Sequence, residues 1–195
     1  MMGGMGKRNQ HRVRVIAGQY KGRRLAYPDE RILRPTMDKT REALFSAVQD
    51  RIPGCVFVDL FSAAGGVGIE ALSRGASMAH FVEQAPRALD CLRENLDACG
   101  VERDRYQIHA KDVYEYLERG GLRTLPDAIV FADPPYDSDD SSILLTHFRE
   151  TEYKNMLLFI LEHRSPVDAP ELGSLKFDKT KRYGETSISF WSRPL

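Results

Sequence analysis

From residue 55 onwards, short apolar runs alternate with stretches in which apolar residues recur at helical spacing. The run at 55–60 is almost continuous, which is typical of a strand buried on both faces of a parallel sheet, whereas the run at 106–109 is short and only half apolar. The runs predict strands at 55–60, 79–83, 106–109 and 128–132. Helices are predicted between them, from about Val67 to Arg74, from Pro86 to near Gly100, and from Val113 to Leu117. This alternation predicts an α/β fold with a doubly wound sheet.

The last third of the chain is predicted to close the same sheet. A helix is expected through Ile143, Leu144 and Phe148, and a strand at 157–161 follows it. Two further strands, at 175–177 and 187–191, have no helical pattern between them. They predict an antiparallel C-terminal hairpin at the edge of a seven-stranded sheet. Ligands of such sheets bind at the carboxyl ends of the strands.

The first fifty residues follow a different pattern. Strands are predicted at 13–18 and 24–27, with a turn between them, and they form a small basic β-hairpin. A helix follows, with Thr36 or Asp38 as its cap and with Arg41, Leu44, Phe45 and Val48 along it. No linker or internal repeat divides the chain. We therefore expect a flexible basic N-terminus at 1–11 and a single domain at 12–195, in which 12–30 is the hairpin extension.

Charge is unevenly placed, although 28 basic and 28 acidic residues balance. A net charge of zero argues against a general binder of polyanions. Between Lys7 and Arg24, however, seven basic residues occur without any acidic one. Such a block is either a solvated basic arm or the footprint of a nucleic-acid contact, and composition alone leaves both readings open.

Cysteine usage and hydropathy favour a cytoplasmic protein. Cys55, Cys91 and Cys99 have no metal-ligand spacing, and we expect them to be reduced thiols. The N-terminal residues lack the apolar core of a signal peptide, and no apolar stretch reaches the length that spans a bilayer. Neither a membrane nor a metal is therefore expected as a partner.

The most informative motif is the tetrad Asp133-Pro134-Pro135-Tyr136, which ends an apolar strand. Proline fixes φ and has no N–H, so the carboxylate, the proline carbonyls and the aromatic ring are held in one rigid arrangement. Such a group can accept hydrogen bonds from a planar amino group and stack a ring on its plane. A nucleobase with an exocyclic amine fits both features. The alternative is a strand that simply ends in a proline-rich turn.

A glycine-rich turn from Asp59 to Gly68 indicates a nucleotide-type ligand. Glycines allow a ligand to approach the backbone and the helix to pack close to the sheet. Glu83 ends the next strand, where its carboxylate can accept hydrogen bonds from two ribose hydroxyls. Asp59 would repel a pyrophosphate but suits a cationic amino-acid end, which favours S-adenosylmethionine over a dinucleotide. The alternative is a tight strand–helix connection. Asp112 can accept from the adenine amino group, cap the helix that follows it, or do both.

The two motifs, in this order, resemble those of amino-methyltransferases that act on exocyclic amines of nucleic-acid bases. Further segments resemble the bacterial RsmD family: Arg14 to Gly18 with Lys21-Gly22-Arg23, Arg34-Pro35-Thr36 with Arg41 to Phe45, Gly68 to Ala76, Glu162-His163, and Lys181 to Gly184. The resemblance spans about Arg12 to Trp191. It implies a Rossmann-like methyltransferase sheet and the transfer of a methyl group from S-adenosylmethionine to guanine N2 of 16S ribosomal RNA, within a small-subunit particle.

The resemblance also implies roles for particular residues. The catalytic residues would be Asp133, Pro134, Pro135 and Tyr136. Asp133 and the Pro134 carbonyl would accept the two amine hydrogens, and Tyr136 would stack on the extruded base. The cofactor would be bound by Asp59, Phe61, Ala63, Gly65, Gly68, Glu83 and Asp112. RNA phosphates would be contacted by Lys21, Arg23, Arg24 and Arg34. Arg41 can instead pair with Glu42 or Asp38 on its own helix.

One residue departs from the family's pattern, which usually has Gly at the position of Ala63. The added methyl group would crowd the methionine moiety or require a backbone shift, particularly if φ is positive there. Two other functions stay open: the same chemistry on another amine, as in an adenine-N6 methyltransferase on DNA or RNA, and, because of the altered cofactor turn, a non-catalytic RNA-binding module. A nicotinamide-dependent oxidoreductase fits less well, because Asp133 and the prolines have no evident role in hydride transfer.

Overall fold

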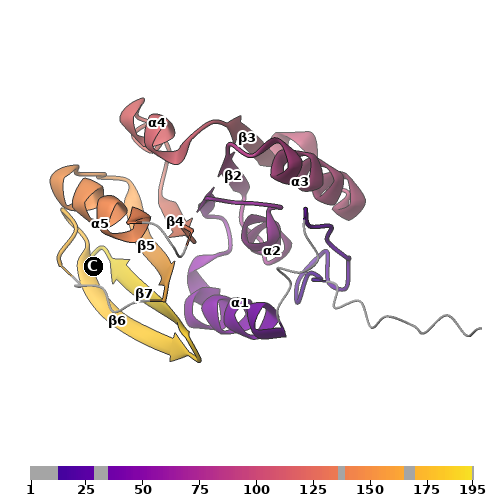
Figure 1. Cartoon of the computed structure of the whole chain (residues 1–195), viewed down its shortest axis with the longest axis horizontal. Coiled ribbons are helices and arrows are strands. Elements are labelled where there is room, and N and C mark those ends of the chain that lie inside the picture. Colours follow the sequence, from indigo (N-terminus) through magenta and orange to yellow (C-terminus); the bar gives the residue numbers. More distant parts are fainter. Residues whose placement is uncertain (1–12, 29–34, 136–138, 165–169, 195) are drawn as a thin grey trace, which may run out of the picture.

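The structure is a computed structural model, and it describes residues 13–28, 35–135, 139–164 and 170–194. Among these residues, seven strands form one sheet in the order β3-β2-β1-β4-β5-β7-β6 (Figure 1). The strands are β1 (Val56–Leu60), β2 (Met78–Glu83), β3 (Tyr106–Ala110), β4 (Ala128–Ala132), β5 (Met156–His163), β6 (Lys176–Tyr183) and β7 (Thr186–Ser192). Strands β1 to β5 are parallel to one another, and β7 lies between β5 and β6 and is antiparallel to both. The predicted doubly wound sheet with an antiparallel C-terminal hairpin is confirmed.

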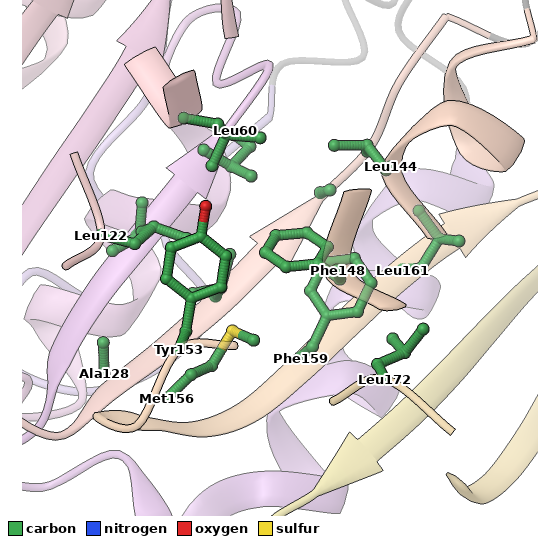
Figure 2. Close-up of a cluster of buried hydrophobic side chains, with 14 of the residues drawn as sticks. Leu60, Leu122, Ala128, Leu144, Phe148, Tyr153, Met156, Phe159, Leu161 and Leu172 are labelled. Carbon is green, nitrogen blue, oxygen red and sulfur yellow. The ribbon is translucent and has the colours of Figure 1, made fainter. Parts of the chain in front are cut away.

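Helices cover both faces of the sheet. The α-helices of the described part are α1 (Pro35–Val48), α2 (Gly66–Ser73), α3 (Pro86–Cys99), α4 (Val113–Glu118) and α5 (Asp140–Glu150), and short 3-10 turns follow α1 and precede β3. Side chains of a strand alternate between faces. Leu60 and Phe159 point to the face covered by α4 and α5, where Figure 2 shows Phe159 against Phe148 of α5. The opposite face carries Phe57 and is covered by α1, α2 and α3.

Most predicted element ends agree with the structure to within one or two residues. The helix α3 begins at Pro86 and ends at Cys99, and the next residue, Gly100, has a φ of 69°, the left-handed cap that favours glycine. Its apolar face carries Leu89, Leu92 and Leu96. All three are buried in one hydrophobic cluster with residues of α2, of β2 and of the N-terminal hairpin. None of the helices in the described segments is long and apolar enough to cross a membrane.

The prediction for the start of α1 was wrong. The helix begins at Pro35, so Thr36 and Asp38 lie inside it rather than at its cap. A proline is favourable at a first helical position because its missing N–H would have no partner there. Asp38 instead accepts a hydrogen bond of 2.9 Å from the Arg41 guanidinium.

The N-terminal hairpin is present, but without two continuous strands. Its arms are joined by one antiparallel bridge, Arg14 to Arg24, and by backbone hydrogen bonds on either side of it. Other backbone N–H groups of the hairpin bond to side chains of the main domain. These contacts replace the ladder that the alternation predicted. The predicted flexible segment 1–11 lies outside the described residues.

Candidate active site

Asp59 lies near the carboxyl end of β1, buried at the base of the glycine-rich turn. Its Oδ2 atom accepts a hydrogen bond of 2.9 Å from the backbone N–H of Gly68, in the first turn of α2. Burial and the nearby Glu83 charge raise the pKa of Asp59 to about 7, although the Gly68 hydrogen bond acts in the opposite direction. A cationic group placed beside this carboxylate would favour its ionised form.

The glycines of the turn are required by close packing. A Cβ atom at Gly68 would lie 2.3 Å from the Phe81 ring, so helix α2 could not approach β2 as it does. Gly65 has a φ of 80°, and a Cβ atom there would lie 2.3 Å from a Leu92 methyl group. A Cβ atom at Gly66 would lie 2.2 Å from the hydroxyl oxygen of Tyr27. Packing against Leu92, Phe81 and Tyr27 therefore requires glycine at these three positions.

Glu83 holds the turn from the end of β2. Its Oε2 atom accepts from the Ala63 N–H at 2.8 Å, and its Oε1 atom accepts from the N–H groups of Gln84 and Ala85. Phe61 and Ala63 have φ values of 59° and 45°, the left-handed region that residues with a Cβ rarely adopt. Each carboxylate oxygen has more than one lone pair, so Glu83 keeps acceptor capacity toward a ligand.

Asp112 caps helix α4, which confirms one of the two roles predicted for it. Its carboxylate accepts hydrogen bonds from the N–H groups of Tyr114 and Glu115 at 2.8 and 3.2 Å. The Tyr114 ring meets Phe61 edge-on at 6.4 Å, and its hydroxyl donates to the Asp140 carboxylate at the start of α5. These contacts link the glycine-rich turn, α4 and α5 at the carboxyl edge of the sheet.

Asp133 follows β4 directly, two residues beyond Phe131, which pairs with Asp59 of β1. Loss of hydration and the neighbouring charges of Glu162 and Asp59 raise the pKa of Asp133 well above its ordinary value. Pro134 is buried and Pro135 is exposed. Tyr136, predicted to stack on a base, lies outside the described residues.

Tyr27 also borders this site, and no pattern in the sequence predicted it. Its hydroxyl lies against Gly66, and the charges of Arg41, Asp59 and Asp133 all act on it. Burial raises the pKa of the Tyr27 phenol to about 12, so the hydroxyl stays protonated at neutral pH. A tyrosine near the end of a basic hairpin gives no sequence signal that it reaches a site 30 to 100 residues away in the chain.

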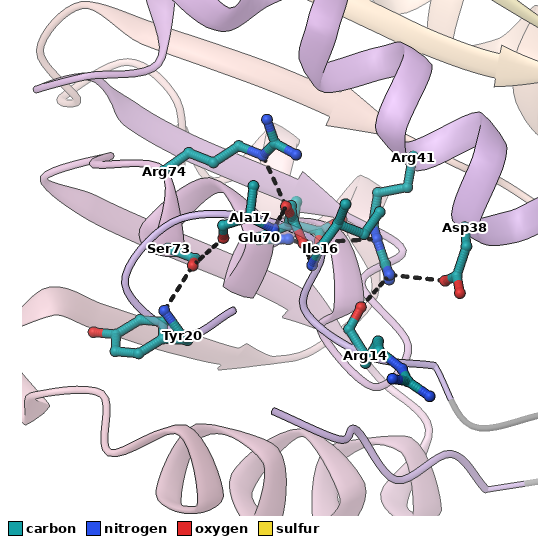
Figure 3. A network of polar contacts seen from close by, with 11 residues as sticks. Arg14, Ile16, Ala17, Tyr20, Asp38, Arg41, Glu70, Ser73 and Arg74 are labelled. Carbon is teal, nitrogen blue, oxygen red and sulfur yellow. Dashed lines mark hydrogen bonds and ion pairs between the residues drawn. The ribbon is translucent and has the colours of Figure 1, made fainter. Parts of the chain in front are cut away.

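Glu70 is the second residue whose importance the sequence did not reveal. It is fully buried in α2 and accepts from the N–H groups of Ile16 and Ala17 at 2.7 and 3.0 Å (Figure 3). Arg74 donates to it at 2.7 Å, and the Arg41 guanidinium lies 3.9 Å away. In the sequence, the signal was a single charged residue within the mostly apolar segment 66–73. This carboxylate attaches the hairpin to α2.

The basic residues separate into two groups. Lys21, Arg23 and Arg24 are exposed on the hairpin, as a phosphate contact requires, whereas Arg34 lies outside the described residues. Arg41 is buried, and its guanidinium donates to Asp38 and to the backbone carbonyl of Arg14. The predicted alternative, a pair with Asp38 on its own helix, is confirmed for Arg41.

The sheet order, the reversed β7 and the acidic, glycine-rich carboxyl edge define the class of Rossmann-like methyltransferases. Among solved structures, a proposed methyltransferase, yhhF, from Escherichia coli matches with a TM-score of 0.77 and 25% identity, over 93% of this chain and 98% of that one. Residues 13–192 match the family described as "Conserved hypothetical protein 95". The chain belongs to this family, the RsmD family of S-adenosylmethionine-dependent rRNA methyltransferases.

Curated relatives agree with this assignment. YlbH from Bacillus subtilis, a proposed rRNA methyltransferase, is 32% identical over 183 residues, which are 93% of this chain and 99% of the relative. Ribosomal RNA small subunit methyltransferase D from Escherichia coli is 35% identical over 124 residues, which are 64% of this chain and 60% of the relative. Similarity to the first of these therefore extends over nearly the whole of both chains.

Proposed function

We propose that this protein transfers a methyl group from S-adenosylmethionine to the exocyclic N2 of a guanine in 16S ribosomal RNA, presented in a small-subunit particle. The observation that carries the proposal is the placement of Asp59 and Asp133 on the neighbouring strands β1 and β4, at one edge of the sheet. One carboxylate faces the glycine-rich turn and the other begins the Asp-Pro-Pro segment. A cofactor and an amine can therefore meet between them.

The residues around the turn fit the cofactor. Asp59, whose pKa burial raises to about 7, would be stabilised in its charged form by the cationic amino-acid end. Glu83 would accept from the ribose hydroxyls, and Phe61 and Tyr114 would border the adenine beside Asp112. Gly65, Gly68 and Ala63 would shape the backbone around the methionine moiety. When bound, the cofactor supplies an electrophilic methyl group on a sulfonium.

Asp133 and Pro134 would prepare the accepting amine. The lone pair of an exocyclic amine is delocalised into the ring, which makes its nitrogen a poor nucleophile. Asp133 and the Pro134 carbonyl would accept its two hydrogens, localise the lone pair and aim it at the methyl group. The positive charge that develops on nitrogen is stabilised by the Asp133 carboxylate, which can then take the released proton. Tyr136 would stack on the extruded base.

The exposed Lys21, Arg23 and Arg24 would contact RNA phosphates, because the hairpin that carries them borders the site through Tyr27. Arg34 would add a contact at the start of α1.

The test is transfer of labelled methyl groups to small-subunit particles from cells that lack this gene, compared with naked 16S RNA and with DNA. Label in N2-methylguanine of the small-subunit RNA supports the proposal. Label in adenine of DNA or RNA would establish the adenine-N6 alternative instead. Absence of cofactor binding at millimolar concentration in calorimetry would favour the non-catalytic RNA-binding module.

A further inference from the structure

One buried amide joins the N-terminal hairpin to the glycine-rich turn. Asn95 lies in α3, and its side chain is 2% exposed. Its Oδ1 atom accepts a hydrogen bond of 2.7 Å from the N–H of Ala26, and its Nδ2 atom donates to the Ala26 carbonyl at 2.9 Å. The same Nδ2 atom donates to the carbonyl of Ala64, also at 2.9 Å. Asn95 therefore contacts a hairpin residue and a residue of the turn at the same time.

These three hydrogen bonds allow one orientation of the Asn95 amide. A side-chain amide has two N–H donors and one oxygen acceptor, and all three are used here by Ala26 and Ala64. A half-turn of the amide would place its oxygen against two carbonyl oxygens and its NH₂ group against the N–H of Ala26. The position of the hairpin at Ala26 and that of the turn at Ala64 therefore depend on each other through one planar group.

Ala64 lies in the part of the turn where the backbone is most constrained. Ala63 before it has a φ of 45°, and Gly65 after it has a φ of 80°. Glu83 holds the N–H of Ala63 from the end of β2, and Asn95 holds the next carbonyl from α3. The amide thus fixes the conformation of the turn and also bonds to the hairpin.

On the hairpin, Ala26 lies close to the residues proposed to contact RNA. The exposed Arg23 and Arg24 precede it by three and two residues, and Arg24 forms the bridge that joins the two arms. An RNA that fixes these side chains also restricts the backbone at Ala26. Through Asn95, the same restriction reaches the carbonyl of Ala64.

Building on the proposed methyl transfer to RNA, we propose that Asn95 is a positioning residue that couples the two substrates, so that RNA on the hairpin strengthens cofactor binding at the turn. The coupling is reciprocal, because each ligand changes the affinity for the other by the same factor. It requires no contact between RNA and cofactor. A ligand that rigidifies a shared group lowers the entropic cost of binding the second ligand.

The experiment measures the affinity for labelled S-adenosylhomocysteine, which has no methyl group to transfer. Equilibrium dialysis is performed with and without saturating small-subunit particles from cells that lack this gene, and the ratio of the two dissociation constants is the coupling factor. The variant Asn95→Asp keeps the size of the side chain and the acceptor for the Ala26 N–H. Its carboxylate, however, places an oxygen against the carbonyls of Ala26 and Ala64.

Asn155→Asp is the matched control. The Nδ2 atom of Asn155 donates to the Leu125 carbonyl at 3.0 Å. Asn155 directly precedes β5, so it lies at the amino edge of the sheet, opposite to the site. The control therefore removes an amide donor to the backbone at a place that contacts neither the hairpin nor the turn.

We expect the particles to tighten cofactor binding by about tenfold in the wild-type protein and in Asn155→Asp, and by less than about threefold in Asn95→Asp. A purely structural role of Asn95 would weaken binding equally with and without particles. An unchanged coupling factor in Asn95→Asp therefore overturns the inference. The inference is also overturned if the particles do not alter the wild-type dissociation constant.

Amide hydrogen exchange tests the same link in the wild-type protein without RNA, and so applies even if Asn95→Asp does not fold. S-adenosylhomocysteine should slow exchange of the Ala26 N–H by about tenfold, because the cofactor fixes Ala64 and with it the amide that accepts from Ala26. Unchanged exchange of this N–H at saturating cofactor overturns the inference. Failure of the proposed function is distinct, because the wild-type protein would then methylate no guanine in the particles.

Discussion

The Oε2 atom of Glu83 accepts a hydrogen bond of 2.8 Å from the backbone N–H of Ala63. This bond holds Ala63 at a φ of 45°, where a residue with a Cβ is less stable than glycine by roughly 1–2 kcal/mol. Ala63→Gly removes this strain but increases the entropy of the unfolded chain, which offsets about 0.4–1 kcal/mol. We expect the variant to be as stable as the wild-type protein or up to ~1 kcal/mol more stable, with tighter cofactor binding in calorimetry.

The matched control is Ala98→Gly, on the exposed side of α3. Glycine in a helix costs up to about 1 kcal/mol relative to alanine, and Ala98 is exposed near the C-terminal end of α3. Urea denaturation should therefore separate the two variants. Equal destabilisation of both, with unchanged cofactor affinity for Ala63→Gly, would contradict the account of the turn.

Asp59 should link cofactor binding and stability to pH. Its pKa of about 7 lies above the ordinary 3.8, so the folded protein holds this proton more tightly than the unfolded chain. The group's stabilising contribution is fully present below about pH 4 and is lost as pH rises through 7. Asp59→Asn removes this loss, and we expect it to raise the free energy of unfolding at pH 8 by about 1–3 kcal/mol. At pH 5 the two proteins should differ less.

Cofactor affinity should change in the opposite direction. The ionised Asp59 is the form that pairs with a cationic amino group, so the wild-type affinity for S-adenosylmethionine should rise from pH 5.5 to 7.5, by up to about tenfold per unit below pH 7. Asp59→Asn should bind at least tenfold more weakly and lack this dependence. A wild-type affinity that falls over this range would rule out the assigned pairing.

Glu70 should decide whether the hairpin stays attached. Glu70→Ala leaves the Arg74 and Arg41 cations and two hairpin N–H groups without their buried acceptor, which is expected to destabilise the protein by about 3–5 kcal/mol. Trypsin should then cleave rapidly within 13–28. Asp90→Asn breaks the Arg93–Asp90 pair, whose partners are 53% and 72% exposed, and should have an effect below about 1 kcal/mol. Similar effects of both changes would contradict the anchoring role.

Lys21, Arg23 and Arg24 of the hairpin are expected to contribute to RNA binding but not to cofactor binding. The triple change Lys21→Gln, Arg23→Gln and Arg24→Gln should weaken RNA binding and reduce its salt dependence, by up to ~0.7 in the logarithmic slope for each lost phosphate contact. Filter binding at several salt concentrations measures both, and cofactor affinity serves as the internal reference. Arg119→Gln, a change at the exposed residue that follows α4, is the matched control. An unchanged slope in the triple variant would place the RNA elsewhere on the surface.

The sequence predicted the elements that local patterns determine. Apolar runs located the strands, and Pro86 and Gly100 located the ends of α3, because backbone preference is strongest at proline and glycine. Asp59 lies near the end of an apolar run, and Asp133 directly follows another. Carboxylates are uncommon at such positions, so the sequence alone indicated both residues. These local signals suffice for the sheet and for the two halves of the site.

Contacts between segments that are distant in the chain could not be predicted from such local patterns. Tyr27, Glu70 and Glu162 owe their positions to the docking of the hairpin and to the register of β4 against β5. A pattern along one strand does not specify which residue of the next strand lies beside it. For the same reason the hairpin backbone was expected to pair with itself, whereas much of it bonds to Glu70, Ser73 and Asn95.

The most direct test of the central claim is a comparison of wild-type protein and Asp133→Ala in single-turnover methylation of small-subunit particles, with cofactor affinity measured on the same preparations. Asp133 is placed on the amine side of the site, so the variant should bind S-adenosylmethionine within a few-fold of the wild-type protein. Its rate of methyl transfer should fall by at least about 100-fold, because the amine loses the acceptor that orients its lone pair. Methyl transfer at a rate near that of the wild-type protein would contradict the account.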